Sequence, residues 1–210
     1  MTRARSLDWP ELIDWCAERG LTLSDVQIEQ LSTYLDTLVL WNRKLALVSQ
    51  SEPEKIISKH LADSLFAASC CRDGEAVVDL GSGAGLPGLP IAVARPASRV
   101  CLIESRGKKA RFLEQACRAA AARNALVCNR RIEAVARDPE HCGRYAVAIA
   151  RALTSTAEFL SLAAPFLVVG GRAIAMRSTN EDPAQDPPDL AEVRYELPDG
   201  TPRRLLIARK

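Results

Sequence analysis

The chain has 210 residues, of which 48% are hydrophobic and 26% are charged. These fractions are typical of a globular domain and exclude a disordered, collagen-like or low-complexity protein. The 28 basic and 26 acidic residues give a net charge of +2, so total charge does not by itself indicate a nucleic-acid partner. The longest uncharged apolar run, residues 161–171, is too short to cross a membrane, and charged residues interrupt the N-terminus where a secretion signal would lie. We therefore expect a soluble, cytoplasmic protein.

The seven cysteines are an odd number without C-x-x-C spacing, and the chain has only two histidines. No familiar zinc-ligand spacing can be assembled from them. We expect buried, reduced thiols and no metal site.

Residues 1–72 predict a helical cap. Capping-box patterns begin at Asp8, with Glu11 three residues later, and at Ser24, with Gln27 three residues later. A further helix restarts at 52–54. Apolar residues recur at helical spacing after the second box, at Ile28, Leu31, Leu35, Leu38 and Val39.

Residues 73–210 alternate short apolar runs with helical stretches. Helices are predicted at 108–123 and 157–167, and a polar, proline-rich loop at 178–188. Strands are predicted at 76–80, 100–104, 125–129, 145–150, 172–176, 192–197 and 203–208. This alternation predicts an α/β fold with a mostly parallel, Rossmann-like sheet covered on both faces. We expect the cap (1–72) and the core (73–210) to form one compact unit.

The most informative segment, DLGSGAGLPG at 79–88, directly follows the first strand. Glycines there allow a tight turn and close approach of a ligand to the backbone. Taken alone, Gly83, Gly85 and Gly88 match the dinucleotide fingerprint, which keeps an NAD-linked oxidoreductase as an alternative. Asp79, however, would repel a pyrophosphate and suits a cationic ligand, unless it only caps a turn. A cationic sulfonium carrying an adenosine fits best, which indicates S-adenosylmethionine.

Three later strand ends carry further candidates for this site. Glu104 ends the second strand, where a carboxylate can accept both ribose hydroxyls of an adenosine. Ile132 and Glu133 follow the third strand, where a loop would pass the adenine. Arg151 follows the fourth strand and would face the ligand crevice, although a salt bridge to a helix terminus is its alternative role.

Basic residues gather in one stretch of the chain. Residues 99–131 hold nine basic residues against two acidic ones. Such a stretch can bind the phosphate backbone of a nucleic acid. The alternative interpretation is that these residues form the solvent-exposed face of a helix.

Six motifs follow one another along the chain, namely WNRKL (41–45), HLADS (60–64), VVDLGSGAGLPGLP (77–90), ESRGKK (104–109), RIE (131–133) and ARAL (150–153). Taken in this order, they resemble the bacterial 16S rRNA guanine-N7 methyltransferases, the RsmG or GidB family. The departures are Ala84 in place of a usual proline, Arg177-Ser178 in place of Lys-Gly, and a lengthened loop at 137–144. The resemblance implies a class I methyltransferase with a seven-stranded sheet whose last strand is antiparallel. It also implies methyl transfer from S-adenosylmethionine to N7 of a guanine in the 530 loop of 16S rRNA.

The same resemblance assigns roles to individual positions. Gly81 and Leu86 would contact the methionine and ribose side of the cofactor, Ile132 and Glu133 its adenine, and Arg151 would lie near both cofactor and target base. Together with Asp79, Gly83, Gly85 and Glu104, these form the expected cofactor site. RNA contacts are expected from Arg43, Lys44, Lys55, Lys59 and His60 on the cap and from Arg106, Lys108 and Lys109. Trp41, at helical spacing with Leu38 and Leu45, is expected in the core rather than stacked on a base.

Guanine N7 carries a free lone pair, so its methylation requires no general base, and we expect no residue in that role. Arg151 would act as a positioning group. Catalysis would come from alignment in a dry pocket. The target base would have to be splayed from its stack. The nearly even charge favours a 30S subunit or assembly intermediate over a short RNA as substrate, and no obligate protein partner is implied. A catalytically silent RNA-binding scaffold is the remaining alternative.

Overall fold

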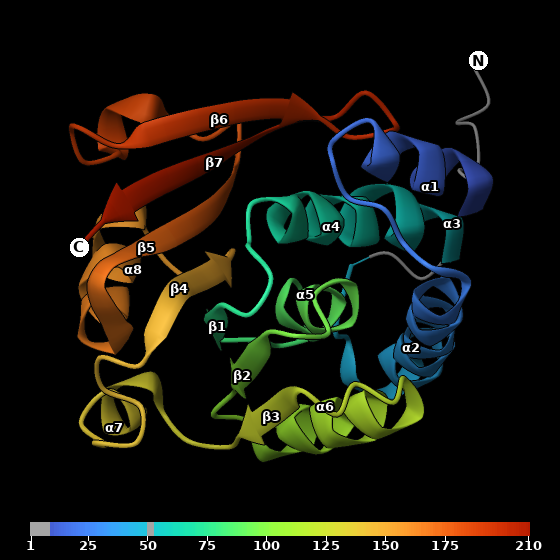
Figure 1. Cartoon of the computed structure of the whole chain (residues 1–210), viewed down its shortest axis with the longest axis horizontal. Helices are drawn as coiled ribbons and strands as arrows, with labels where there is room; N and C mark the ends of the chain where they lie inside the picture. The colour runs from blue at the N-terminus through green and yellow to red at the C-terminus, as the bar shows by residue number, and fades with distance from the viewer. Residues whose placement is uncertain (1–8, 50–52) are drawn as a thin grey trace.

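The computed structural model describes residues 9–49 and 53–210, and it is built around one seven-stranded sheet with strand order β3-β2-β1-β4-β5-β7-β6 (Figure 1). The first five strands are parallel, and β7 runs antiparallel to both of its neighbours. The predicted fold class and the antiparallel last strand are confirmed. The strands are β1 (Ala76–Leu80), β2 (Arg99–Ile103), β3 (Ala125–Cys128), β4 (Tyr145–Arg151), β5 (Leu167–Ser178), β6 (Ala191–Glu196) and β7 (Pro202–Arg209).

The N-terminal region is helical, as predicted. Its elements are α1 (Trp9–Ala17), α2 (Asp25–Leu45), α3 (Pro53–Ile56), the π-helical turn η1 (Ile57–Leu61) and α4 (Ala62–Ser69). The Ser24 capping box forms, because the Gln27 N–H donates to Ser24 Oγ and the Ser24 N–H donates to Gln27 Oε1 at 2.8 Å. The Asp8 box and the start of the helix predicted at 52–54 depend on residues outside the described ranges.

Helices cover both faces of the sheet. On one face, α2 packs with α5 (Gly88–Ala94) and α6 (Gly107–Ala119), and Leu38, Leu89 and Phe112 share one apolar cluster. On the other, α7 (Ile132–Val135) and α8 (Thr156–Ala163) lie against a second cluster that includes Leu80 and Phe159. The cap helices therefore share a hydrophobic core with the sheet.

Two predicted boundaries are wrong. The helix predicted to reach residue 123 ends at Ala119, where Ala121 adopts a positive φ of 50°. The helix predicted to run to residue 167 ends at Ala163, and β5 begins at Leu167 rather than at 172. Gly170 and Gly171, which lie between those two predicted elements, are inside β5, beside a register shift between Tyr145 and Val147 of β4.

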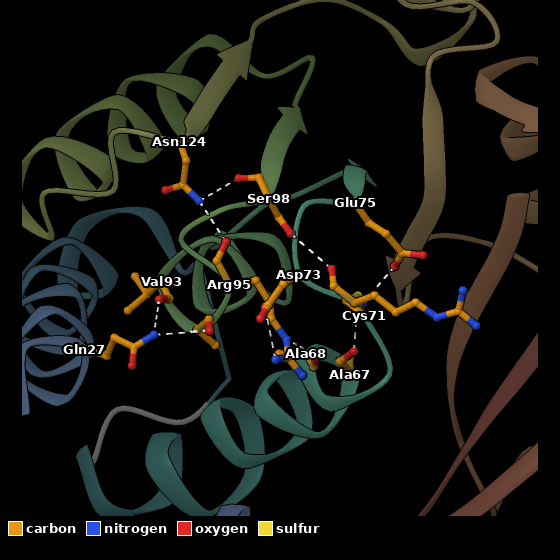
Figure 2. A network of polar contacts seen from close by, with 12 residues as sticks. Gln27, Ala67, Ala68, Cys71, Asp73, Glu75, Val93, Arg95, Ser98 and Asn124 are labelled. Carbon is orange, nitrogen blue, oxygen red and sulfur yellow. Dashed lines mark hydrogen bonds and ion pairs between the residues drawn. The ribbon is translucent and has the colours of Figure 1, made fainter. Parts of the chain in front are cut away.

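A polar network ties the helices to the amino ends of the strands (Figure 2). Asn124 Nδ2 donates to the carbonyls of Ala92, Arg95 and Ser98 at 2.8, 3.3 and 2.9 Å. Arg95 Nε donates to the Ala68 carbonyl at 3.1 Å, and Gln27 Nε2 donates to the Val93 carbonyl at 2.9 Å. This network anchors α2, α4 and α5 at one edge of the sheet and leaves the carboxyl edge open for a site.

All seven cysteines are free thiols. Four are buried, as expected, but Cys70 and Cys128 are half-buried and Cys142 is exposed, so the expectation of buried thiols is wrong at Cys142 and only partly met at the other two. Among residues 9–49 and 53–210, no cluster of three or more His, Cys, Asp or Glu side chains is placed to hold a metal. None of the helices described there is both long and apolar enough to span a bilayer.

Candidate functional site

The glycine loop connects β1 to α5 at the carboxyl edge of the sheet. Gly81, Gly83 and Gly85 have φ angles of 74°, 55° and 83°, a region that side chains disfavour. The N–H groups of Gly81 and Ser82 both donate to the Ile103 carbonyl at 2.9 Å, which fixes the loop against β2. A Cβ at Gly81 would lie 2.6 Å from Leu153 Cδ1, whereas one at Gly83 would meet nothing closer than 3.7 Å. The loop is therefore tightly packed against Leu153 at Gly81, and at Gly83 it leaves space for a ligand.

Asp79 lies beneath this loop. Its side chain is 1% exposed, Oδ2 accepts a hydrogen bond from the Gly88 N–H at 3.0 Å, and Oδ1 is buried without a hydrogen-bond partner. Burial raises the pKa of Asp79 from 3.8 to about 7, and the Gly88 and Ser82 hydrogen bonds oppose that rise. Asp79 therefore caps the start of α5 and does not line the neighbouring cleft.

Glu104 holds the loop from the side of β2. Its Oε2 accepts from the Gly83 N–H at 3.1 Å, and its Oε1 accepts from the Arg106 N–H at 2.7 Å. A carboxylate offers about four acceptor sites, so two hydrogen bonds leave capacity for a ligand hydroxyl. Glu104 is buried, so these contacts also fix the position of its carboxylate.

A cleft of about 460 Å³ opens between the glycine loop and the cap. That size falls in the range of small-molecule sites. One wall is the glycine loop with Lys109 and Arg151, and the opposite wall comes from the cap and the turn between β6 and β7. The lining residues on that second wall are Leu47, Val48, Ser49, Lys59, His60, Asp63, Leu197, Thr201 and Arg203.

The HLADS motif builds the polar part of the cap wall. His60 lies on the π-helical turn η1, a helix irregularity that is frequent at functional sites. His60 Nδ1 accepts a hydrogen bond from Arg151 Nη1 at 2.8 Å. Ser64 Oγ donates to the His60 carbonyl at 2.7 Å and is buried. Burial, followed by the charges of Arg151, Arg203 and Lys59, lowers the pKa of His60 to about 3, so the ring is neutral and can accept this bond.

Asp63 is the centre of a buried ion-pair network. Arg203 Nη2 donates to Asp63 Oδ2 at 2.9 Å, and Arg203 Nε donates to Oδ1 at 3.2 Å. The Tyr195 hydroxyl also donates to Oδ1, at 2.5 Å, and the Tyr195 ring stacks on Phe66 with centroids 3.6 Å apart. Arg151 Nη1 lies 3.9 Å from Oδ2. Burial lowers the pKa of Arg151, and the charge of Asp63 opposes that shift.

The structure brings part of the predicted site together. Gly81, Gly83, Leu86, His60, Lys109 and Arg151 line the cleft. Gly85 lies within the loop, and Ile132 and Glu133 lie on α7, away from the cleft lining. Arg43, Lys44, Arg106 and Lys108 are exposed and lie outside the lining.

Sequence reasoning missed Arg203 and Tyr195. Both come from the C-terminal strand pair and meet Asp63 across more than 130 residues of chain. No local pattern marks them, because their role depends on the order of the strands. Arg177, at a position where the chain departs from the resembled family, is buried and donates to the Thr154 carbonyl at 2.5 Å.

Comparison with known proteins decides the family. The family model described as GidB, rRNA small subunit methyltransferase G, matches residues 27–194. The chain belongs to the rRNA small subunit methyltransferase G family. The ribosomal RNA small subunit methyltransferase G of Roseiflexus sp. is 39% identical over 77% of this chain and 69% of its own length. The protein of that name from Xanthomonas axonopodis pv. citri is 39% identical over 76% of this chain and 74% of its own.

Solved structures agree on the fold. A protein described as a predicted O-methyltransferase from Agrobacterium tumefaciens superposes with a TM-score of 0.57 at 19% identity, covering 70% of this chain and 80% of that one. A SAM-dependent methyltransferase from Aquifex aeolicus gives a TM-score of 0.55 at 13% identity, covering 75% and 93%.

Membership of the methyltransferase G family makes the chain an S-adenosylmethionine-dependent rRNA methyltransferase. It also removes the oxidoreductase and scaffold alternatives. The residues present fit the cofactor: the glycine loop is open at Gly83, and Glu104 is fixed beside it with acceptor capacity left for a ligand hydroxyl.

Proposed function

We propose that this protein transfers the methyl group of S-adenosylmethionine to N7 of a guanine in the 530 loop of 16S rRNA. The observation that carries the proposal is the cleft itself, which joins the glycine loop to Lys59 and His60 of the cap and to Arg203 of β7 in a chain of this family. An rRNA substrate would place the reaction in the cytoplasm, on the 30S subunit or an assembly intermediate.

The cofactor would lie along the glycine loop. Gly81, Gly83 and Leu86 would provide backbone and apolar contacts, and Glu104 would accept the ribose hydroxyls. Asp79 would act from below the loop, through the Gly88 N–H that it holds at the start of α5, with Gly85 supporting the turn. Ile132, Glu133 and Arg151 complete the proposed set, Ile132 and Glu133 on the adenine side and Arg151 on the methionine side.

The residues of the cleft need only hold and orient the substrates. When bound, S-adenosylmethionine supplies an electrophilic methyl group on a sulfonium that leaves as a neutral thioether. The N7 lone pair forms the new bond, and the electrons of the broken carbon–sulfur bond return to sulfur, so no proton must be removed first. Asp63 is already engaged by Tyr195 and Arg203, which agrees with a site that uses no general base.

The proposed RNA surface gains support from the packing of α2 on α6. The rings of Trp41 and Phe112 lie 5.9 Å apart, and Trp41 is partly buried against the core, as expected. This contact brings the basic end of α2 to the basic start of α6. Arg43 and Lys44 in the last turn of α2, and Arg106 and Lys108 at the start of α6, are exposed, and Lys109 of α6 lines the cleft. Such a cluster suits a phosphate backbone.

The test is to incubate the protein and labelled S-adenosylmethionine with 30S subunits and with deproteinised 16S rRNA, both from cells lacking this gene. Methylated sites would be mapped by chemical cleavage at N7-methylguanine. We expect one cleavage in the 530 loop and a higher rate on the particle. Cofactor binding without labelled RNA would contradict the substrate assignment. A short hairpin of the 530 loop is included as a third substrate, and equal rates on it and on the particle would contradict the preference for the particle.

Two variants of α6 refine this test. Lys109→Ala removes a cation that lines the cleft, whereas Arg118→Ala removes an exposed cation in the last turn of the same helix. We expect Lys109→Ala to raise KM for the RNA and Arg118→Ala to leave it nearly unchanged. Equal effects would indicate that α6 acts only through its total charge.

A further inference from the structure

We propose that Arg203, with Arg151 beside it, binds a phosphate group of the RNA substrate at the end of the cleft away from the adenosine. This inference rests on the proposed function and adds a residue that the glycine loop and the cap motifs do not indicate.

The sheet order places Arg203 on the substrate side. Because β7 is antiparallel, its first residues lie at the carboxyl edge, where Arg203 is in register with Ser178 at the end of β5. Along that edge the order is β2 with Glu104, β1 with the glycine loop, β4 with Arg151, then β5 and β7. With the ribose expected at Glu104, Arg203 lies on the other side of Arg151. A ligand group that reaches it comes from beyond the cofactor's adenosine.

Arg151, Arg203 and Asp63 together carry one positive charge in excess. Asp79 also acts on Arg151 through its charge, but burial raises the pKa of Asp79 to about 7. Arg151 and Arg203 share a single carboxylate, that of Asp63, and both approach its Oδ2. His60 adds no charge, because its pKa is lowered to about 3. Tyr195, which also faces Asp63, is a hydroxyl with a raised pKa and stays neutral. Lys59 adds a further positive charge to the same wall. An anionic group from the ligand would balance the excess.

Arg203 has hydrogen-bond donors left over to bind such an anionic group. Asp63 engages Arg203 through Nε and Nη2, and within the described ranges no hydrogen bond is made by Nη1. Both arginines line the cleft, with side chains 15% and 18% exposed for Arg151 and Arg203. A guanidinium held on one side by a buried carboxylate is pre-organised, so it loses little freedom when the remaining donors bind an oxyanion. A phosphate is the oxyanion that an RNA provides.

Two other roles for Arg203 must be distinguished from this one. The methionine carboxylate of the cofactor is also an oxyanion, and binding to it would alter cofactor affinity instead. A purely structural clamp on Asp63 would alter stability alone. Both differ from the proposal in what can be measured.

The test uses a charge-neutral amide pair, Asp63→Asn with Arg203→Gln, which removes the Arg203 guanidinium without leaving a buried carboxylate unpaired. The pair leaves the net charge of the cluster unchanged, with the excess now on Arg151, so an effect on KM reports the lost Arg203 donors and not the total charge. The control is Arg194→Gln, which removes an exposed cation of β6 that lies outside the cleft lining. For each protein, calorimetry gives the Kd of S-adenosylmethionine, and steady-state kinetics on 30S subunits gives kcat and KM at several salt concentrations.

We expect the amide pair to bind S-adenosylmethionine within about twofold of the unchanged protein and to lose about tenfold in kcat/KM through KM, as for a lost hydrogen bond between charged groups. The slope of log kcat/KM against log salt should become shallower by about 0.7–0.9, the contribution of one phosphate. The control should retain both values.

Weaker binding of S-adenosylmethionine with an unchanged KM for the RNA would overturn the proposal and indicate that Arg203 binds the methionine carboxylate of the cofactor. An unchanged KM and an unchanged salt slope in a folded variant would overturn it too, and would indicate that Arg203 only holds Asp63 in place. If the amide pair does not fold, Arg203→Lys retains an ion pair with Asp63 but lacks the fork needed to bridge a second oxyanion. We expect it to raise KM several-fold, and an unchanged KM would overturn the proposal. Failure of the unchanged protein to methylate 30S subunits would instead refute the proposed function.

Discussion

Replacing Asp63 with alanine tests whether the buried ion-pair network holds the cap against the sheet. The Asp63 side chain is 1% exposed and accepts hydrogen bonds from Tyr195 and from two nitrogens of Arg203, while Arg151 lies 3.9 Å away. Asp63→Ala leaves two guanidinium groups facing each other without their shared carboxylate. It also leaves the Tyr195 hydroxyl, which comes from β6, without its acceptor.

The expected loss of stability is about 3–5 kcal/mol, the usual cost of removing one partner from a buried pair. For a chain of this size each kcal/mol lowers Tm by about 2–4 °C, so Tm should fall by roughly 10 °C. Asp73→Ala is the matched control. Asp73 also pairs with an arginine, Arg95, at 3.3 Å, but its side chain is 69% exposed and Arg95 keeps its bond to the Ala68 carbonyl. That pair should be worth at most about 1 kcal/mol.

Urea unfolding at pH 7.5, followed by circular dichroism without cofactor, measures both losses directly. The reasoning requires Asp63→Ala to lose at least about 2 kcal/mol more than Asp73→Ala at equal m-values. Equal losses below about 1 kcal/mol would show that the Asp63 network is solvated and contributes no more than a surface pair.

Three further predictions concern the glycine loop and the cap. Gly88→Ala should lower the unfolding free energy by about 1–3 kcal/mol, because its Cβ would lie 2.3 Å from Leu102 Cδ2 and 2.6 Å from Asp79 Oδ2. Gly107→Ala is the matched control, because Gly107 is likewise the first residue of a helix and a Cβ there would meet nothing closer than 3.7 Å. Equal losses in urea unfolding would refute the clash. Asp79→Asn should become more stabilising relative to the unchanged protein as pH rises from 4 to 7. The pKa of Asp79 in the folded protein, about 7, is higher than its ordinary value of 3.8. The protonated carboxyl therefore contributes its full stability below about pH 4, and this contribution is lost as pH rises through 7. Each unit of difference in pKa corresponds to about 1.4 kcal/mol. Unfolding titrations at pH 5 and 8 measure that change, and a constant difference between the two proteins would contradict it. Finally, residues 1–72 and 73–210 should unfold in one transition, because cap leucines share a core with α5 and α6; separate transitions by tryptophan fluorescence and by circular dichroism would show two units.

Much of the fold followed from local patterns in the chain. The strand β1 and the glycine loop were predictable because an apolar run ending at Asp79 and closely spaced glycines has few other conformations available. The boundary between α8 and β5 was not, because β5 pairs with β4 at Leu167 and again only from Arg172, while Gly170 and Gly171 between them are held by backbone hydrogen bonds with Lys210 at the other end of the chain.

The candidate site divides in the same way. By itself, the sequence determined the class of fold, the loop at 81–88, the carboxylate of Glu104 beside it and the arginine at the end of β4, since each depends on residues close together in the chain. Only the tertiary structure decided that Asp63 of the cap is held by Tyr195 and Arg203, which are 132 and 140 residues away. It also decided that Asp79 caps α5 from below the cleft. Periodicity and turn chemistry act between neighbours in sequence, whereas an ion pair forms wherever strand order and helix packing bring the two charges together.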